Sequence, residues 1–366
     1  MSALGEILAR RIAIDGPMRL DQYMMECLLH PGHGYYTTRD PLGRAGDFVT
    51  SPEISQMFGE MLGLCLGQVW LDQGSPASFV LAELGPGRGT LMADMLRAIR
   101  AVPGMAEAAR VCLVEASPVL RAEQRRTVGR AEWFDTVADL PEGPLFLVAN
   151  EFFDALPIRQ FVRRGPGWAE RQVGLSDGVL TPGLAPPVPL AVLHDRLGDT
   201  RDGDVVEICP TAPGIVAEVA RRIARDGGAA VFVDYGHWRS LGDTFQALKA
   251  HAPCDPFAAP GEADLTAHVA FEPLARAACA EGAAVSAMTT QGVLLERLGI
   301  TARAQTLARG LAGERLATHV AAHRRLTHPE EMGQLFQTLA IYPGRAPLPP
   351  GFDPASEDMS QNGHHA

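Results

Sequence analysis

Apolar residues in this chain first form a clear strand-and-helix pattern between Phe79 and Arg97. Residues 79–84 are an apolar run that contains one acid, Glu83. A glycine-rich stretch follows, and from Thr90 onward apolar side chains recur at the spacing of one helix face, at Leu91, Met95, Leu96 and Ile99. A strand, a tight turn and a helix in this order are typical of the opening unit of a nucleotide-binding doubly wound sheet.

Other apolar runs predict the remaining strands of this sheet. The stronger runs are residues 110–117, 145–149 and 229–236, and the weaker ones are residues 131–134 and 335–342. Amphipathic spacing predicts two short helices within residues 3–30 and further helices at 51–70, 212–226, 272–281 and 301–311. Because strands alternate with helices, we expect an α/β fold with a doubly wound sheet.

Residues 158–210 break this alternation. Short runs joined by turn residues at 165–167 and 176–178 indicate antiparallel strands, and a proline-rich tract follows them. Residues 237–270 look like a long loop-rich segment, a type that is usually functional or mobile. We therefore divide the chain into an N-terminal helical region that packs on the core (1–75), a core (76–157 and 205–342), an inserted β-rich cap (158–204) and a flexible tail (343–366).

Composition and charge exclude several kinds of partner. The net charge of −11 argues against nucleic acid as the main ligand, although it permits a cationic substrate.

The six cysteines form no CxxC pair, so we expect a reducing compartment and no metal site. No apolar run approaches the roughly 20 residues of a membrane span, so no membrane insertion is expected. The first residues resemble an amphipathic helix rather than a signal or transit peptide, which predicts a bacterial cytoplasmic protein.

The glycine-rich turn narrows the choice of ligand. Its pattern is G-x-G-x-G over residues 85–89, whereas a dinucleotide site has G-x-G-x-x-G. Glycines permit a tight turn and allow a ligand to lie against backbone N–H groups. The spacing, with an acid two residues earlier, resembles motif I of the class I S-adenosyl-L-methionine-dependent methyltransferases. That resemblance implies that Glu83, Gly85, Gly87 and Gly89 hold S-adenosyl-L-methionine; a plain turn without a ligand is the alternative.

Two more strand ends carry candidate site residues. Glu115 ends the second predicted strand, where nucleotide-binding folds place an acid on the ribose hydroxyls; a surface acid is the alternative. Asn150, Glu151 and Asp154 follow the apolar run 145–149. Ligands of open α/β sheets lie beyond the carboxyl ends of the strands, so this is where a methyl acceptor would bind. The alternative for Asp154 is a solvated helix cap.

A third polar group precedes the helix that we expect to begin at Ser51, with Ser51 as N-cap and proline next. Asp47, Thr50 and Glu53 lie close together there, which capping alone does not explain. We add Thr50 to the candidate cofactor ligands, and Asp47 and Glu53 to the candidate acceptor-binding carboxylates. His268 is a candidate base, although a lone histidine is more often structural.

Several motifs taken together resemble the MidA family. They are GDFVTSPEISQMFGE at 46–60, ELGPGRGTL at 83–91, NEFFDALP at 150–157, VDYGH at 233–237 and ADLTAHVAF at 263–271. Members are methyltransferases related to the mitochondrial arginine methyltransferase of complex I assembly, whose activity is symmetric dimethylation of an arginine on a complex I subunit. The resemblance spans roughly residues 20–342. It implies a class I methyltransferase (Rossmann-like) sheet with N-terminal helices and an inserted substrate region.

These inferences lead to one predicted function and two alternatives. We expect in-line methyl transfer to an arginine of a protein substrate, by resemblance a complex I subunit. A guanidinium is a poor nucleophile because its pKa is about 13.8. Carboxylates at Glu151 and Asp154, with Asp47 less certain, would localise its charge on one nitrogen, and Asn150 would support the cofactor. The alternatives are a methyltransferase that acts on a small molecule and a non-catalytic assembly factor that binds the cofactor. A homodimer is compatible with the predicted function and with both alternatives.

Overall fold

The computed structural model describes residues 2–38 and 50–356, and the chain folds as two compact units. The first unit draws on residues 1–48, 154–212 and 239–270. The second unit draws on residues 49–153, 213–238 and 271–366. Each unit therefore combines segments that lie far apart in the sequence, and each is described separately.

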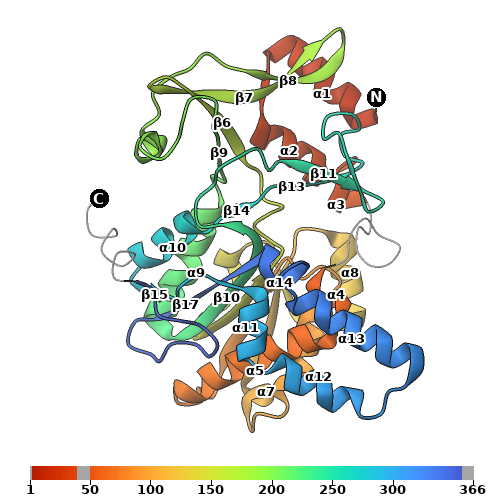
Figure 1. The fold of residues 1–366 in the computed structure, drawn as a ribbon, viewed down its shortest axis with the longest axis vertical. Coiled ribbons are helices and arrows are strands. Elements are labelled where there is room, and N and C mark those ends of the chain that lie inside the picture. Colours follow the sequence, from red (N-terminus) through yellow and green to blue (C-terminus); the bar gives the residue numbers. More distant parts are fainter. Residues whose placement is uncertain (1, 39–49, 357–366) are drawn as a thin grey trace. The chain divides into compact units, whose positions relative to one another are not determined.

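The second unit is built on a mixed sheet with the strand order β15–β17–β10–β5–β2–β3–β4 (Figure 1). The strands are β2 (Phe79–Leu84), β3 (Ala109–Val114), β4 (Glu132–Phe134), β5 (Leu145–Asn150), β10 (Gly228–His237), β15 (Ala283–Val285) and β17 (Phe336–Pro343), and β16 (Thr289–Thr290) also pairs with β17. Strands β2, β3, β4, β5 and β10 are parallel, whereas β17 runs antiparallel to β10. The chain moves outward from β2 in one direction and then, from β5, in the other. The switch point of this doubly wound sheet therefore lies between β2 and β5.

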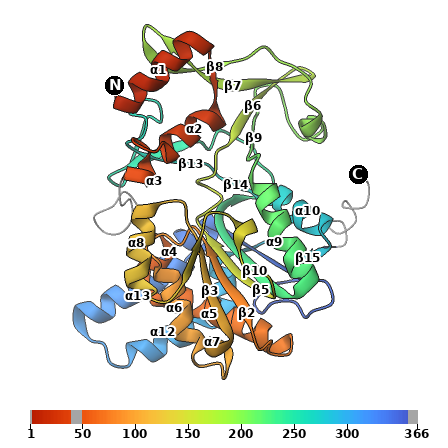
Figure 2. The same ribbon diagram turned by 180° about the vertical axis from the view of Figure 1, so that it is seen from behind.

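The central strands are buried along their whole length, as parallel strands covered on both faces must be. Some of the helices of this unit supply the cover, and others pack on those helices. The helices are α4 (Ser51–Ile54), α5 (Gln56–Asp72), α6 (Thr90–Ile99), α7 (Met105–Ala108), α8 (Pro118–Thr127), α9 (Ala212–Asp226), α10 (Phe271–Ala280), α11 (Gln291–Arg297), α12 (Ile300–Ala308), α13 (Gly313–Thr327) and α14 (Met332–Leu335). Figures 1 and 2 show α9 and α10 side by side next to β15 and β17. No helix in the described part of the chain is long and apolar enough to cross a membrane.

The prediction of one helix from Ser51 to about residue 70 was wrong. The chain is extended at Ser55 (φ −161°, ψ 139°), which separates α4 from α5. The hydroxyl of Ser55 accepts the Met57 N–H at 3.3 Å and so caps α5, and serine favours such a cap over a helix interior. Thr50, not Ser51, is the N-cap of α4, although proline does occupy its first turn as expected.

A glycine row brings α5 close to α6. A Cβ on Gly59 would lie 2.6 Å from Asp94 Cβ, and one on Gly63 would lie 3.0 Å from the Cα of Met95. Gly67 is also tight, because a Cβ there would lie 3.1 Å from a methyl group of Val102. Close packing of α5 on α6 therefore depends on residues without side chains at these positions.

The first unit contains an antiparallel sheet, a smaller sheet and helices (Figure 1). The larger sheet comprises β1 (Met18–Arg19), β6 (Arg159–Arg164), β7 (Gly167–Ser176), β8 (Val179–Leu184) and β9 (Val205–Ile208), and the helices are α1 (Ala3–Asp15), α2 (Leu20–Leu29) and α3 (Tyr35–Thr38). The antiparallel hairpins predicted after residue 158 are confirmed. The segment expected to be loop-rich holds the smaller sheet, β11 (Gln246–Lys249), β12 (Ala252–Cys254) and β13 (Asp264–Thr266), and the short strand β14 (Val269–Ala270). Strands this short carry too little pattern to be recognised from sequence.

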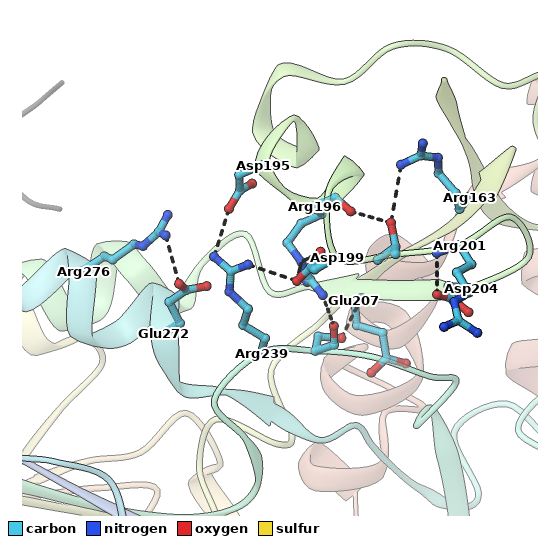
Figure 3. Close-up of polar contacts among 12 residues, drawn as sticks. Arg163, Asp195, Arg196, Asp199, Arg201, Asp204, Glu207, Arg239, Glu272 and Arg276 are labelled. Atoms are coloured by element: carbon cyan, nitrogen blue, oxygen red, sulfur yellow. Dashed lines mark hydrogen bonds and ion pairs between the residues drawn. The ribbon is translucent and has the colours of Figure 1, made fainter. Parts of the chain in front are cut away.

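An arginine network joins the chain before β9 to the loop that begins at residue 239 (Figure 3). Arg196 is buried, its Nε lies 3.0 Å from both carboxylate oxygens of Asp199, and its Nη2 donates to the Ser240 carbonyl at 2.8 Å. Arg239 donates to Asp199 at 3.0 Å, and the Glu207 N–H donates to the Ser240 hydroxyl at 2.9 Å. These contacts fix the loop against strand β9.

Part of the segment expected to form a flexible tail is held in place. Phe352 is buried in the core of the second unit, and the Ala287 N–H donates to the Asp353 carbonyl at 2.8 Å. Arg297 also donates to the Asp353 carboxylate at 2.7 Å. The proline-rich composition that suggested a frayed end does not reveal the one aromatic side chain that anchors it.

We expect Gly59→Ala to destabilise the second unit by about 1–3 kcal/mol, because the added methyl group meets α6 and forces the helices apart. Urea unfolding monitored by circular dichroism measures this change. Gly214→Ala in α9 is the matched control, since nothing lies within 4 Å of its Cβ position, and it should stabilise by about 0.5–1 kcal/mol. Equal effects of the two variants would contradict the packing argument.

Candidate functional site

The strand register brings three predicted site segments to one edge of the sheet in the second unit. Leu84, the last residue of β2, pairs with Val114 of β3 and with Ala149 of β5. Glu115 and Asn150 are each the next residue along their chains, and Gly85 follows Leu84 directly. Parallel strands end at the same edge, so these groups adjoin the switch point, which is where open α/β sheets bind their ligands.

The turn after β2 has the backbone conformation that its glycines predict. Gly85, Gly87 and Gly89 have φ values of +59°, +54° and +83°, a region that residues with a side chain rarely adopt. A Cβ on Gly85 would also lie 2.9 Å from Cδ2 of Phe152. The turn is therefore restricted to glycine by conformation, and at Gly85 by space as well.

Glu83 is a buried carboxylic acid beneath this turn. Burial raises its pKa to about 8, and the nearby Glu115 carboxylate adds to the rise, while a hydrogen bond from the Met92 N–H opposes it. Its Oε2 is buried and has no hydrogen-bond partner among the described residues. A buried acid in this state gains strongly from a cationic group placed against it.

Glu115 is held by a residue that the sequence did not single out, Gln124 on α8. Glu115 Oε1 accepts the Ser117 N–H at 2.7 Å, and Oε2 accepts Gln124 Nε2 at 3.1 Å. The same Nε2 donates to the Gly87 carbonyl at 2.8 Å, and the Gln124 carbonyl oxygen accepts the indole N–H of Trp133 at 2.8 Å. Burial raises the pKa of Glu115, against these hydrogen bonds and the charge of Arg121. Gln124 therefore couples the acid after β3 to the turn after β2.

At the end of β5, Glu151 occupies a strained conformation and receives two hydrogen bonds. Its φ is +51°, which is unfavourable for a residue with a long side chain. Its Oε1 accepts the Ser51 N–H at 3.0 Å and Asn150 Nδ2 at 3.0 Å. The Glu151 N–H donates to the Val233 carbonyl on β10 at 2.9 Å. The start of α4 is thus fastened to the end of β5 by this carboxylate.

Asp234 on β10, a second residue that was not chosen as a site residue, holds the chain after Glu151. It is fully buried, and its Oδ2 accepts the N–H groups of Phe152 at 3.2 Å and Phe153 at 3.0 Å. Its Oδ1 accepts the Tyr235 N–H at 3.0 Å. An acid at the end of an apolar strand was visible in the motif at 233–237, but its partners were not.

The remaining predicted site residues fall into different parts of the molecule. Thr50 occupies the N-cap position of α4 immediately before Ser51, without a side-chain cap hydrogen bond. Glu53 on the same helix accepts the Thr90 hydroxyl at 2.5 Å, so both residues adjoin the glycine turn and Glu151. Asp154 and His268 belong to the first unit; Asp154 is buried, and its carbonyl accepts the Ala267 N–H at 3.0 Å. Asp47 lies outside the described residues.

The second-unit residues fit a ligand that carries a cation and hydrogen-bond donors. Glu83 Oε2 and Asn150 Oδ1 are buried acceptors without a partner among the described residues. Such groups are rare in folded proteins, because each loses its hydration without compensation. An amino group against Glu83 and a donor against Asn150 would satisfy both.

Comparison with protein families gives a match over residues 61–289 to a model described as "Putative S-adenosyl-L-methionine-dependent methyltransferase". Among curated proteins, the chain is 36% identical to the mitochondrial protein arginine methyltransferase NDUFAF7 of Xenopus tropicalis, over 93% of this chain and 86% of the relative. It is also 36% identical to the human protein of that name, over 92% of this chain and 82% of the relative.

Comparison with solved structures also indicates a methyltransferase. A COG1565 superfamily protein of Burkholderia thailandensis, crystallised with S-adenosyl-homocysteine, superposes with a TM-score of 0.81 at 30% identity. The match covers 98% of this chain and 95% of that one. The predicted class I fold and the predicted cofactor, S-adenosyl-L-methionine, are confirmed.

The predicted cytoplasmic location is contradicted, because the similar curated proteins of frog, human and fly are named as mitochondrial. The prediction was based on the scattered cysteines and on a first helix that does not resemble a signal or transit peptide. A reducing compartment, whether cytoplasmic or mitochondrial, would favour the same scattered free cysteines. These sequence features therefore do not distinguish the two locations.

We expect the pKa of Glu83 to be visible in the pH dependence of stability. The folded-state pKa of about 8 lies above the ordinary value, so the folded protein binds more protons between pH 5 and 8, and the free energy of unfolding falls as pH rises through that range. The slope contributed by one proton is at most about 1.4 kcal/mol per pH unit. Glu83→Gln should remove this contribution, as measured by urea unfolding of both proteins at several pH values.

The control for this measurement is Glu132→Gln. Glu132 is half exposed, and its pKa is lowered by the hydrogen bond from Arg110, so its contribution is constant above pH 5. Parallel stability curves for the wild type and Glu83→Gln would refute the raised pKa of Glu83.

Proposed function

Because this chain belongs to the family of S-adenosyl-L-methionine-dependent methyltransferases, we propose that it transfers the methyl group to an arginine side chain of a protein. Two considerations support a protein arginine. Similar proteins over most of the chain are named protein arginine methyltransferases. In addition, a hydrogen-bonded carboxylate stands at the strand end where an acceptor of this fold binds.

The cofactor would be held by residues of the second unit. Glu83 is suited to the cationic amino group, Glu115 to the ribose hydroxyls, and the glycine turn to the amino-acid end. S-adenosyl-L-methionine supplies an electrophilic methyl group on its sulfonium. The protein does not need to create a reactive group, so its own contribution is positioning and electrostatics.

Glu151 carries the proposal for the acceptor. Its backbone is strained, and strain of this kind persists where surrounding contacts impose it, most often at functional sites. Oε1 already accepts two hydrogen bonds, which preorganises the carboxylate. A guanidinium bound to it would concentrate positive charge on the nitrogens in contact and leave the remaining nitrogen more nucleophilic.

Asp154 and Asp47 complete the proposed acceptor-binding carboxylates. Asp154 follows Glu151 by three residues along the chain and is buried. By resemblance to the MidA family we propose a subunit of respiratory complex I as the acceptor. The cap over residues 158–204 remains our proposal for the region that contacts this protein.

We expect Glu151→Gln to lower turnover by at least about a hundredfold and to change S-adenosyl-L-methionine affinity by less than about threefold, because only the acceptor charge interaction is lost. Calorimetry measures cofactor affinity. Turnover is measured as transfer of a labelled methyl group to complex I purified from a strain that lacks the gene. Glu123→Gln, a partly exposed position on α8, is the control and should leave both quantities unchanged.

In the strain itself, mass spectrometry of complex I should show the loss of one or more arginine methyl groups. Restoring the wild-type gene should restore them, and restoring Glu151→Gln should not. An unchanged pattern of arginine methylation across the proteins of the deletion strain would reject the arginine acceptor and favour a small-molecule substrate.

A further inference from the structure

A hollow of about 410 Å³ lies wholly within the first unit. This volume is in the range of small-molecule and side-chain binding sites. Its walls are mainly apolar, formed by Pro182, Leu184, Phe245, Pro256 and Phe257, and its charged members are Arg171 and Asp243. None of the residues assigned to the cofactor or to the acceptor-binding carboxylates lines it.

The apolar side of the hollow is preformed. The ring of Phe257 packs against Tyr23, with centroids 5.4 Å apart, and against Phe245 at 5.9 Å. The Tyr23 hydroxyl donates to the Pro256 carbonyl at 2.6 Å. The Phe257 N–H donates to Asp255 Oδ1 at 2.9 Å. A ligand entering this space would not have to order its walls, which removes one of the usual costs of binding.

Arg171 is held firmly through one of its terminal nitrogens. Nη1 donates to Gln160 Oε1 and to Asp243 Oδ2, each at 2.6 Å. Gln160 is buried, and its Nε2 donates to Asp243 Oδ1 at 2.8 Å and to Glu207 Oε1 at 2.6 Å. Figure 3 shows Glu207 beside the arginine network that fixes the neighbouring loop. Both Asp243 oxygens are therefore already used, and the position of the guanidinium is set.

The edge of this guanidinium that Nε and Nη2 form is available to a ligand. In the described part of the chain, no group accepts a hydrogen bond from Nε or Nη2 of Arg171, and the side chain is 22% exposed. Elsewhere in the protein the same edge binds a carboxylate with two parallel hydrogen bonds. Arg159 holds Glu170 at 2.7 and 2.9 Å in this way, and Arg19 holds Asp21 at 3.0 and 3.0 Å.

The hollow therefore combines an apolar wall with an unused carboxylate-binding edge. Arg171 pairs across the hairpin with Leu184, a residue that is 47% exposed, so the guanidinium and an accessible apolar surface are neighbours. A ligand that filled both would present an apolar or aromatic group together with a nearby carboxylate. Such a pair of groups occurs in a protein segment where an aromatic residue adjoins an acidic residue or a chain terminus.

We propose that this hollow is a docking site for an acidic segment of the acceptor protein that carries an aromatic side chain next to its carboxylate. The identity of the partner rests on the proposed function, whereas the chemistry of the site does not. The chain carries a net charge of −11, and Asp243 and Glu207 lie near Arg171, so the segment is not attracted from a distance. Recognition comes from the short-range fork of hydrogen bonds, and binding should depend weakly on salt.

The test is calorimetric titration of the full chain with 3-phenylpropionate, in parallel with 3-phenylpropanamide. The two probes share an aromatic ring and differ in the carboxylate. We expect the acid to bind at least about tenfold more tightly than the amide, since the charge-assisted fork is lost in the amide. Equal binding of the two probes, or no detectable binding of the acid at millimolar concentrations, would overturn the proposal.

Variants locate the site. Arg171→Gln should weaken binding of the acid to the level of the amide, and Arg201→Gln, an exposed arginine of the same unit, should leave it unchanged. Because Arg171→Gln also disturbs Asp243, a second variant is Leu184→Ala, which changes only an exposed wall and should weaken both probes by several-fold. An acid affinity that neither variant alters would place the probe elsewhere and reject the hollow as its site.

This test is independent of the methylation experiment. If complex I of the deletion strain keeps its arginine methyl groups while 3-phenylpropionate binds and responds to Arg171→Gln, the arginine acceptor fails and the docking chemistry stands. If methyl groups are lost but Arg171→Gln leaves the affinity for 3-phenylpropionate unchanged, the proposed function stands and the docking site is rejected.

Discussion

The architecture of the second unit depends on polar groups that lie at the buried carboxyl ends of its parallel strands. Glu83, Glu115 and Asn150 are brought together because β2, β3 and β5 are parallel and in register. The apolar burial that stabilises the sheet also removes water from these groups, which is why the pKa values of both acids are raised. A cation bound at Glu83 would reverse that effect and release a proton. Cofactor affinity and protonation are thereby linked.

Buried side chains that bond to the fold itself keep this arrangement rigid. Gln124 satisfies Glu115 and the Gly87 carbonyl at once, and Asp234 accepts two N–H groups of the turn that follows Glu151. Each of these two side chains is buried and hydrogen-bonded to the fold itself. The unfulfilled acceptors at this edge, among the described residues, are on Glu83 and Asn150. The protein therefore separates structural polar groups from those left for a ligand.

The sequence predicted the main strands of the second-unit sheet, the glycine turn, the first-unit hairpins and the fold class, because long apolar runs and glycines act locally. It did not predict the break at Ser55, since apolar periodicity continues across it and only the cap hydrogen bond reveals it. It also missed Gln124 and Asp234, whose roles are set by partners 37 and 82 residues away. The docking hollow was invisible for the same reason: Arg171 and Asp243 are 72 residues apart.

The position of Gln124 has one more consequence. Its amide joins the Glu115 carboxylate to the indole N–H of Trp133, and the ring of Trp133 also lies under the guanidinium of Arg125 at 4.7 Å. Indole emission responds to hydrogen bonding and to nearby charge. A ligand that bound to Glu115 would therefore disturb the hydrogen bond of a single amide to Trp133, and the emission of this tryptophan would report the binding.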